Sequence, residues 1–598
     1  MEAQPITTDS YVLPGCWMLL LCWHSMLKLH ATFCYLLLLL SLFGLACSDK
    51  ADFPFIEDAT QSRLKSEYDY IIVGGGTAGC PLAATLSQKF RVLVLERGGI
   101  PYGNPNIERI ERFEQNLAEV NDSAPAQEFI SEDGVMNHRA RVLGGGTCLN
   151  AGFYSRCSDE YARRAGWDLA LVKESFLWVE ERVVFVPVLR QWQAAVRAGL
   201  LESGVLPDRG VTFDHLIGTK TSGSIFDQQG HRHTAADLLR AANFSNIAVL
   251  VHATVSRILF AGSCGGLPGC KPRAFGVIYS DRQGIDHLAL LSSGPSNEVI
   301  LSAGALGSPQ LLLLSGIGPA QDLASFGIPE VLDLEEVGKG MADNPTNAVV
   351  VPSPRPVELA LLQIVGITDF GSFIETGSAP ASVLAGGLLA GTTVPPMNRS
   401  RALTDQIMSQ LRAIQNTAPS LSSQIGFILE KVIGPLSNGD LRLNTTDIRD
   451  NPLVRFNYFS QPQDLDRCIR GMRAIERVIN SPAMATFTFR RVADIPEPLM
   501  NAVRLIGNML PSNTADSDAV ARFCRDTVMT IWHYHGGCQM GRVVDKDYRV
   551  FGVDALRVVD GSTYEFTPGT NPQATTMMLG RYMGIQILRE RLQSEPKV

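Results

Sequence analysis

Two short apolar segments lie near the start of the chain, with a glycine-rich stretch between them. Residues 68–73 read YDYIIV and residues 91–95 read RVLVL. Short β-branched runs of this kind are typical of strands that are buried on both faces. Between them come GGGTAG at residues 74–79 and a segment of helical character at residues 81–88. The order strand, glycine turn, helix, strand predicts a compact βαβ unit.

The glycine turn has the G-x-G-x-x-G spacing of a dinucleotide-binding site, and its place between a strand and a helix supports that interpretation. Gly74 permits the tight turn, Gly76 lets the backbone approach a pyrophosphate, and Gly79 lets the helix lie close to the sheet. Glu96 ends the second strand, where it can accept hydrogen bonds from ribose hydroxyls, and an acid there disfavours NADP. FAD and NAD use the same unit, so this motif alone leaves both cofactors open.

The segment before this unit has the pattern of a secretory signal peptide. Residues 26–48 read MLKLHATFCYLLLLLSLFGLACS, in which a basic residue precedes an apolar run and then small residues. The apolar run is shorter than the roughly 20 residues that span a bilayer. Cleavage is expected near Ala46 or Cys47, and the pattern leaves open whether Met1 or Met26 starts translation. We therefore expect a secreted, extracellular protein with no stable membrane span after cleavage.

The cysteines fall into separate groups. Cys80 and Cys148 lie inside glycine-rich segments and are interpreted as small buried thiols. Cys264 and Cys270 flank the run GGLPG and could close a small loop. No spacing of the cysteines indicates a metal site. If the chain is secreted, four sequons are candidate glycosylation sites: Asn121, Asn243, Asn398 and Asn444.

Length and composition limit the class of protein. A chain of 598 residues exceeds what one hydrophobic core usually serves, so we expect two domains. Hydrophobic residues make up 45% and charged residues 19%, which is typical of a globular protein. The formal net charge of −8 provides no general basic field, so we expect no nucleic-acid partner. Residues 378–423 are rich in Gly, Ser, Ala and Pro and are interpreted as a surface excursion.

Five further segments decide between the cofactors. They read RVLGGGTCLNAGFYSR at residues 141–156, GALGSPQLLLLSGIG at 304–318, VGKGMADNP at 337–345, WHYHGGCQMG at 532–541 and RVVDGSTYEFTPGTNPQAT at 557–575. Together with the glycine turn, and in this order, they resemble the signature segments of the glucose-methanol-choline (GMC) flavoenzymes. The resemblance covers roughly residues 68–589 and is closer to the plant branch that holds HOTHEAD-like proteins and mandelonitrile lyases. It implies FAD as the cofactor.

The resemblance also implies a fold and a set of cofactor contacts. The expected fold is α/β, with a Rossmann-like FAD-binding domain of discontinuous segments and an inserted α+β substrate domain. The expected boundaries are a signal peptide at 1–47, FAD-binding segments at 68–153, 247–344 and 531–589, and substrate-domain segments at 154–246 and 345–530. The expected cofactor-binding residues are Gly74, Gly76, Thr77, Ala78, Gly79, Glu96, Arg97, Val142, Gly146, Asn150, Ala151, Gly152, Phe153, Val255, Trp532, Asp560, Gly561, Asn571, Pro572 and Gln573.

Two residues are implied to carry the chemistry. Counting back from Cys538 in the family's motif gives His533 as the catalytic base, while His535 falls on a variable position and is expected to be structural. His533 would remove the hydroxyl proton as hydride leaves the carbinol carbon for the flavin. Asn571 would hold the substrate oxygen through its amide. The predicted activity is therefore that of an FAD-dependent alcohol dehydrogenase or oxidase acting on a small-molecule alcohol.

The resemblance leaves alternatives open. HOTHEAD-like relatives suggest long-chain ω-hydroxy fatty acids as substrates, but the residues do not identify the alcohol or the electron acceptor. A mandelonitrile lyase is the second hypothesis, although lyases of this branch carry a histidine at the Asn571 position, a tyrosine at the Ile531 position and a substrate-contacting cysteine. This chain has no cysteine between Cys270 and Cys468. A secreted flavin-bound protein without turnover is the third hypothesis. Relatives in the lyase branch also imply a disulfide between Cys468 and Cys524.

Overall fold

The computed structural model describes residues 53–594, apart from 62–66, 120, 122, 263–270, 379–422 (of which residue 409 is described), 507 and 570. Residues 55–598 form one compact unit, to which the following description applies. The predicted leader, the Cys264–Cys270 loop, Asn398 and most of the 378–423 segment lie outside the described residues. No helix in the described part of the chain is long and apolar enough to cross a membrane.

A six-stranded parallel sheet contains the predicted βαβ unit. Its order is β1-β10-β3-β2-β14-β24, and every neighbouring pair is parallel. Its strands are β1 (Ile56–Asp58), β2 (Tyr70–Val73), β3 (Val92–Glu96), β10 (Ile247–Val251), β14 (Glu298–Leu301) and β24 (Leu556–Val558). β2 and β3 lie within one or two residues of the predicted strands. β1 was not predicted; it precedes residue 68 and extends the sheet at its edge.

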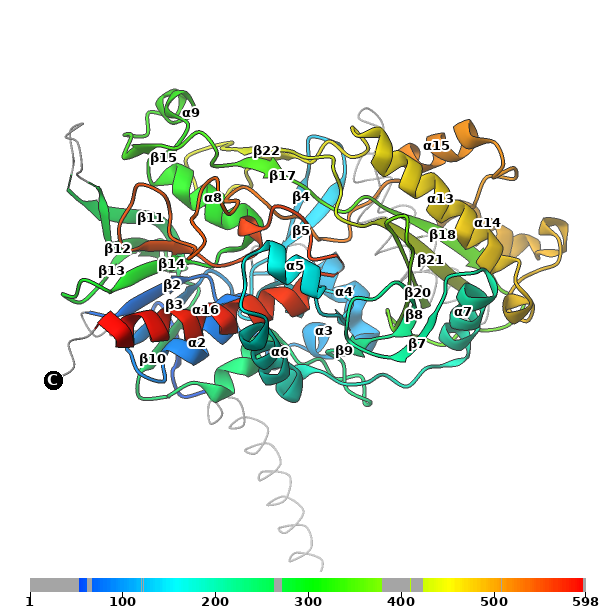
Figure 1. Cartoon of the computed structure of the whole chain (residues 1–598), viewed down its shortest axis with the longest axis horizontal. Helices are drawn as coiled ribbons and strands as arrows, with labels where there is room; N and C mark the ends of the chain where they lie inside the picture. The colour runs from blue at the N-terminus through cyan, green and yellow to red at the C-terminus, as the bar shows by residue number, and fades with distance from the viewer. Residues whose placement is uncertain are drawn as a thin grey trace, which may run out of the picture. The chain divides into compact units, whose positions relative to one another are not determined.

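The two faces of this sheet are covered differently. Ile71 and Val73 share a buried cluster with Val255 and Val277 of the antiparallel strands β11 (Thr254–Ala261) and β12 (Arg273–Ser280), which pair with β13 (Asp286–Leu290). Helices α2 (Gly79–Leu86) and α16 (Gln573–Ser594) contact each other and lie across the sheet in Figure 1. Since both faces are covered, the central strands β2 and β3 are buried along their whole length, as their sequence pattern predicts.

A second six-stranded sheet lies in the other half of the unit in Figure 1, in the order β18-β21-β20-β19-β8-β7. It is antiparallel except for the parallel β7–β8 pair. The strands are β7 (Asp208–Val211), β8 (Gly218–Thr221), β18 (Thr346–Pro352), β19 (Ile364–Ile367), β20 (Ser372–Ser378) and β21 (Ile425–Val432). The two segments predicted to be inserted, 154–246 and 345–530, thus contribute strands to one sheet. Their residue boundaries stay a prediction.

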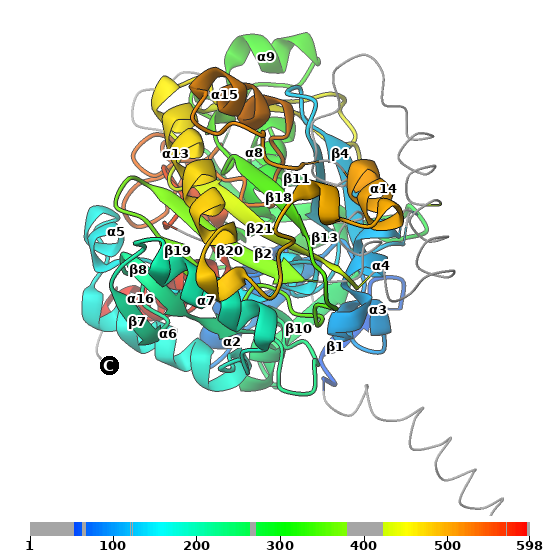
Figure 2. The same ribbon diagram turned by 90° about the vertical axis from the view of Figure 1, so that its right-hand side faces the viewer.

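Helices cover one face of the antiparallel sheet, as Figure 2 shows: α7 (Gln191–Glu202) and α13 (Pro462–Ile479), with α15 (Ser517–Asp526) packed on α13. Cys468 of α13 and Cys524 of α15 form a disulfide, which confirms the predicted pairing. On the opposite face, α14 (Glu497–Ile506) packs its Leu499 against Ala348 and Val350 of β18. This sheet is therefore also buried on both faces.

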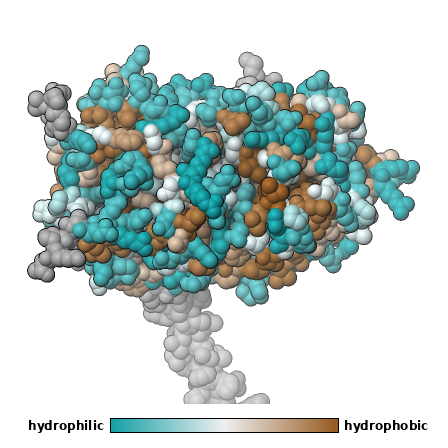
Figure 3. Space-filling view, in the orientation of Figure 1, coloured by the Kyte–Doolittle hydropathy of each residue, from teal (hydrophilic) through white to brown (hydrophobic). Residues whose placement is uncertain are grey.

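Shorter elements connect these layers. The helices are α3 (Pro105–Glu108), α4 (Phe113–Ala118), α5 (Asp159–Arg164), α6 (Leu169–Val183), α8 (Gly304–Leu314) and α9 (Ala320–Ser325). The strands are β4 (Ala126–Ile130), β5 (Met136–Ala140), β6 (Phe153–Tyr154), β9 (Gly223–Ser224), β15 (Ile317–Gly318), β16 (Leu332–Asp333), β17 (Lys339–Met341), β22 (Gly439–Arg442) and β23 (Leu453–Arg455). On the face shown in Figure 3, hydrophilic residues surround smaller groups of apolar ones, which is ordinary for a globular protein.

Candidate active site

The glycine turn between β2 and α2 forms part of the wall of a cavity. Gly74 has φ +102°, and a Cβ there would lie 2.4 Å from the Ser302 carbonyl oxygen. A Cβ at Gly79 would lie 2.0 Å from the Gly74 carbonyl oxygen. Gly76 differs, because a Cβ there would be 3.8 Å from its nearest protein neighbours while the residue lines the cavity. Gly74 and Gly79 are thus required by the protein's own packing, whereas Gly76 leaves room for a ligand.

Glu96 closes the far end of the turn. Its carboxylate accepts hydrogen bonds from the Gly75 N–H (3.0 Å) and the Gly98 N–H (2.8 Å), and it lines the same cavity. Burial raises the pKa of Glu96, and the two backbone donors act in the opposite direction. The carboxylate therefore organises the turn itself. Its remaining lone pairs can meet ribose hydroxyls, as the sequence predicted.

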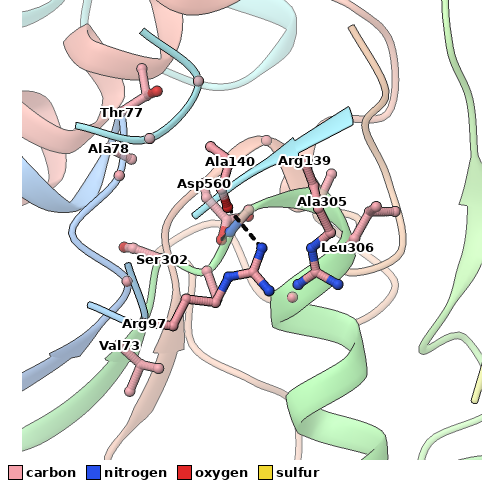
Figure 4. Close-up of a pocket in the computed structure, with 18 of the residues that line it drawn as sticks. Val73, Thr77, Ala78, Arg97, Arg139, Ala140, Ser302, Ala305, Leu306 and Asp560 are labelled. Carbon is pink, nitrogen blue, oxygen red and sulfur yellow. Dashed lines mark hydrogen bonds between the residues drawn. The ribbon is translucent and has the colours of Figure 1, made fainter. Parts of the chain in front are cut away.

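Two guanidinium groups face this cavity. Figure 4 shows Arg97 and Arg139 beside one another, with Arg97 donating to the Ala140 carbonyl at 2.8 Å. Arg97 also donates to Gln127 Oε1 at 2.7 Å. Burial lowers the pKa of Arg139 to about 10, which still leaves it charged at neutral pH. A pair of planar cations suits a diphosphate.

Asp560 joins the turn after β24 to the start of α8. Its Oδ2 accepts hydrogen bonds from the Gly304 N–H (2.9 Å) and from Ser308 Oγ (2.6 Å), and its Oδ1 accepts from the Ser562 N–H (2.8 Å). The bonds from Gly304 and Ser308 hold together segments that lie more than 250 residues apart in sequence. Asp560 and Gly561 also line the cavity.

A second cavity adjoins the first. The two share Thr77, Ala140, Gly146, Tyr534, Pro572 and Thr576 in their walls. The second cavity is also lined by the predicted residues Asn150, Ala151, Gly152, Phe153, Trp532, His533, Asn571 and Gln573. Asn150 and Gln573 are joined by a side-chain hydrogen bond of 2.9 Å, which closes one wall. An elongated ligand can therefore extend from the glycine turn to the two predicted catalytic residues.

His533 is buried in the wall of the second cavity. Its backbone N–H donates to Asp343 Oδ1 at 3.1 Å, and Asp343 Oδ2 accepts from the Tyr458 hydroxyl at 2.5 Å. Its Nδ1 has no hydrogen-bond partner among the described residues. Burial lowers the pKa of His533 well below 6.5, and the charge of Lys431 lowers it further. The imidazole is therefore neutral at physiological pH, which is the form that a general base needs.

His535 lines the first cavity, not the second. Its Nδ1 lies 3.0 Å from the His533 carbonyl oxygen and donates to it, so its Nε2 is an acceptor. That Nε2 is buried without a partner in the described part of the chain. Burial lowers the pKa of His535 to about 4. The side chain is thus bonded within its own loop and also faces the first cavity. Its structural role stays a prediction.

Asn571 begins the segment that leads into α16 and lines the second cavity together with His533. Its Oδ1 accepts a hydrogen bond from Lys431 Nζ at 2.8 Å. Lys431 lies 3.9 Å from Glu375 Oε2, and both charged side chains are completely buried. Burial lowers the pKa of Lys431 to about 8, although the charge of Glu375 raises it. Sequence reasoning did not identify this pair, because neither residue lies in a recognised motif.

The structure brings together the predicted site residues with one exception. All of them line one of the two cavities except Gly79, which acts through helix packing. Sequence reasoning missed Arg139, Ser302, Ala303, Tyr534 and His535, which also line the first cavity. A signal existed for most of them, since they lie inside or within a few residues of the recognised segments. Within the residues that the structure describes, no group of three or more His, Cys, Asp or Glu side chains is placed to hold a metal ion.

The fold and the two cavities define a class of protein. Two family models, each described as GMC oxidoreductase, match residues 68–346 and 435–580. The chain belongs to the GMC oxidoreductase family, and it is an FAD-dependent oxidoreductase acting on CH–OH groups. The residues fit that cofactor, because Gly76 leaves room at the turn, Glu96 suits a ribose and Arg97 and Arg139 suit a diphosphate.

Individual relatives cover nearly the whole chain. Protein HOTHEAD of Arabidopsis thaliana is 50% identical over 537 residues, which are 88% of this chain and 89% of that protein. An (R)-mandelonitrile lyase-like protein of the same plant is 50% identical over 543 residues (90% and 93%). Sinalpyl alcohol oxidase Nec3 of Nesocodon mauritianus is 42% identical over 588 residues (96% and 99%). Pyridoxine 4-oxidase from Mesorbium loti shares the fold, with a TM-score of 0.68 at 20% identity over 87% of this chain and 98% of that one.

Proposed function

We propose that this protein oxidises a primary alcohol to an aldehyde, with His533 as the base and Asn571 as the group that holds the substrate oxygen. The observation that carries the proposal is that these two residues, 38 positions apart in sequence, line one cavity that adjoins the cofactor cavity. A neutral imidazole suits removal of the hydroxyl proton, and a carboxamide can donate a hydrogen bond to the substrate oxygen.

Each residue has a distinct task in this mechanism. Bound FAD supplies the acceptor for the hydride. The imidazole of His533 accepts the hydroxyl proton, and the hydrogen bond from its backbone to Asp343 fixes the loop that carries it. The amide of Asn571 donates to the oxygen as negative charge develops there, without exchanging a proton itself. Proton removal and stabilisation of the oxygen are thereby divided between two residues.

The lining of the second cavity favours an apolar alcohol. Leu117, Leu149, Leu362, Ile531 and Trp532 contribute apolar surface beside the polar groups. Such walls bind hydrocarbon or aromatic groups and exclude water. The name of the alcohol oxidase relative adds an aromatic alcohol to the candidates, beside the long-chain ω-hydroxy fatty acids.

An alcohol panel tests the proposal. Purified holoprotein is mixed anaerobically with anisyl alcohol, sinapyl alcohol, a long-chain ω-hydroxy fatty acid and simple aliphatic alcohols, and the flavin absorbance is followed. Bleaching by at least one alcohol, with the aldehyde as product, is the expected result. Repeating the assay with oxygen and with an artificial acceptor then identifies the class of oxidant. A correctly folded, flavin-loaded protein that no alcohol reduces would contradict the proposal.

Mandelonitrile lyase activity is the second candidate, because a lyase-like relative is as similar in sequence as HOTHEAD. Cyanohydrin cleavage needs one group to deprotonate the hydroxyl and another to protonate the leaving cyanide. Asn571 cannot serve as an acid or a base, and Ile531 lines the cavity where a phenol would be needed. Cyanide release from mandelonitrile without flavin bleaching would favour the lyase. A lack of response to both substrates would favour a non-catalytic flavoprotein.

We also propose that the protein is secreted and glycosylated. The leader pattern supports this, as do the Cys468–Cys524 disulfide and the positions of Asn121 and Asn444, which are exposed, and Asn243, which is partly exposed. N-terminal sequencing of protein from the culture medium, before and after glycosidase treatment, tests the proposal. Retention inside the cell with an intact leader would contradict it.

A further inference from the structure

Lys431 is an unusual residue for its place in the fold. It lies near the end of β21, within the sequence IGFILEKV, and its side chain has no exposed surface. A buried ammonium group is costly unless it is paired and hydrogen-bonded. The hydrogen bond that it donates goes to Asn571 Oδ1, at the proposed catalytic position. Lys431 itself is not among the described residues that line the cavity.

The strand register places the partners of Lys431. Phe373 of β20 pairs directly with Lys431, and Glu375 of β20 pairs with Leu429, so these side chains leave the same face of the sheet. The ammonium group lies 4.2 Å from the centre of the Phe373 ring and 3.9 Å from Glu375 Oε2. Glu430 leaves the opposite face, where its Oε1 accepts a hydrogen bond from Ser372. Lys431 is thus held between an aromatic ring, a carboxylate and Asn571.

The chemistry of the lysine fixes the orientation of the amide. An ammonium group only donates hydrogen bonds, so the side of Asn571 that faces Lys431 must be the carbonyl oxygen. Glu375 acts in the same sense, since a carboxylate only accepts. Burial raises the pKa of Glu375, while the charge of Lys431 and the Asn571 side chain act in the opposite direction. Neither of its carboxyl oxygens has a hydrogen-bond partner among the described residues. Turning the amide over would bring Nδ2 to the ammonium and Oδ1 toward the carboxylate, and both contacts are unfavourable.

We propose that Lys431, backed by Glu375, is a positioning residue that holds Asn571 with one Nδ2 N–H available to the substrate oxygen. The inference rests on the proposed alcohol oxidation and assigns a role to two residues outside the recognised motifs. A free asparagine can present either its oxygen or its nitrogen to a ligand, and only the nitrogen stabilises a developing alkoxide. Because Lys431 binds the carbonyl oxygen of Asn571, the amide presents its nitrogen to the cavity before substrate binds.

Lys431 also acts on the base. Its positive charge contributes to the lowered pKa of His533, together with burial and the neighbouring His535. The negative charges of Glu375, Asp343 and Glu430 in turn raise the pKa of Lys431. Removing the charge at position 431 should therefore raise the pKa of His533. The acid limb of the rate profile then moves to higher pH, which simple loss of packing would not cause.

A double-mutant cycle tests the inference. The variants are Lys431→Met, Asn571→Ala and their combination. Glu430→Gln is the matched control on the opposite face of the same strand, since burial raises the pKa of Glu430 to about 8 and the substitution changes little charge at neutral pH. Because Lys431→Met leaves Glu375 without its cation, Lys431→Met/Glu375→Gln is made as a second route that removes both charges. Flavin reduction by anisyl alcohol is followed by stopped flow, and binding of anisaldehyde, a carbonyl product, is measured from the flavin absorbance of the oxidised holoprotein.

Lys431→Met and the charge-free pair should slow flavin reduction about 10- to 100-fold, the scale on which misplacement of a reacting group acts. On the pH-independent part of the rate profile, where the effect of Lys431 on His533 is absent, either change should have little further effect when Asn571 is already alanine, since the lysine then acts through that residue. Anisaldehyde binding should weaken in the same non-additive way, and Glu430→Gln should behave as wild type. Rates that are unchanged by loss of the lysine, or losses that add to that of Asn571→Ala, would overturn the inference.

Failure of the proposed function gives a different result. If the wild-type flavin is not reduced by anisyl alcohol or any other alcohol, alcohol oxidation is wrong. The cycle is then judged on anisaldehyde binding alone. Weaker binding that depends on Asn571 still supports the positioning role, and binding that is insensitive to Lys431 overturns it.

Discussion

His533 and His535 are separated by one residue, yet they line different cavities and have different partners. If His533 is the base, His533→Ala should slow flavin reduction by alcohol about 10²–10⁴-fold, or roughly 3–5 kcal/mol, while flavin stays bound. His535→Ala should instead alter flavin occupancy or absorbance, because its side chain faces the cofactor cavity. Stopped-flow reduction and flavin content of both variants provide the test. Wild-type reduction rates in His533→Ala would contradict the mechanism.

The pH dependence of the reaction follows from the lowered pKa of His533. Burial and the Lys431 charge hold this pKa well below 6.5. A general base acts in its deprotonated form, so a lower pKa extends activity toward acid. The rate of flavin reduction should therefore be level from neutral pH down to 6.5 and decline only below it. A pH profile with half the maximal rate above 6.5 would show that another group controls the proton transfer.

Gly76 and Gly79 belong to the same motif but should respond differently to alanine. Gly76→Ala places its methyl group toward the cavity, where the nearest protein atoms are 3.8 Å away, so the protein should fold and lose bound flavin. Gly79→Ala forces a Cβ to 2.0 Å from the Gly74 carbonyl and should lower the free energy of unfolding by about 1–3 kcal/mol. Flavin content and thermal unfolding of the apoproteins distinguish the two. Equal stability of both apoproteins would contradict this assignment.

At the level of secondary-structure elements, the disulfide joins α13 to α15 across 56 residues. In the chain-entropy picture, closing a loop of this length contributes about 4 kcal/mol. Replacing Cys468 and Cys524 by alanine should lower the free energy of unfolding by that amount, whereas Cys157→Ala, which removes a buried free thiol, isolates the effect of losing a sulfur atom. Thermal unfolding with and without reductant checks the prediction. A reductant should destabilise the wild type and leave the double variant unchanged.

At the level of the whole molecule, the cofactor cavity is lined by residues from Val73 to Thr576. A ligand bound there connects segments that are distant in sequence, so it stabilises the folded chain relative to the unfolded one. Removing FAD should lower the unfolding temperature, and free FAD at about 100 times its dissociation constant should restore roughly 2.7 kcal/mol. Gly76→Ala should show no such response. An apoprotein as stable as the holoprotein would contradict this picture.

The sequence by itself determined the features that depend on neighbouring residues. The βαβ unit, the glycine turn and Glu96 were predictable because strand, turn and helix propensities and the motif spacing are local properties. The ordered segments also located both catalytic candidates and most of the cavity lining. The helix after the glycine turn was predicted to begin at residue 81, and α2 begins two residues earlier because Gly79 both ends the turn and begins the helix.

Tertiary structure decided the features that depend on strand register and long-range packing. Lys431 lies 140 residues from Asn571 in sequence, and within β21 its pattern gave no sign that an ammonium group would be buried against a cavity wall. The Asp560 contacts with α8, the placement of His535 in the cofactor cavity and the addition of β1 at the sheet edge have the same origin. Each of these features depends on which distant segments pack together, and a local pattern of residues does not predict that packing.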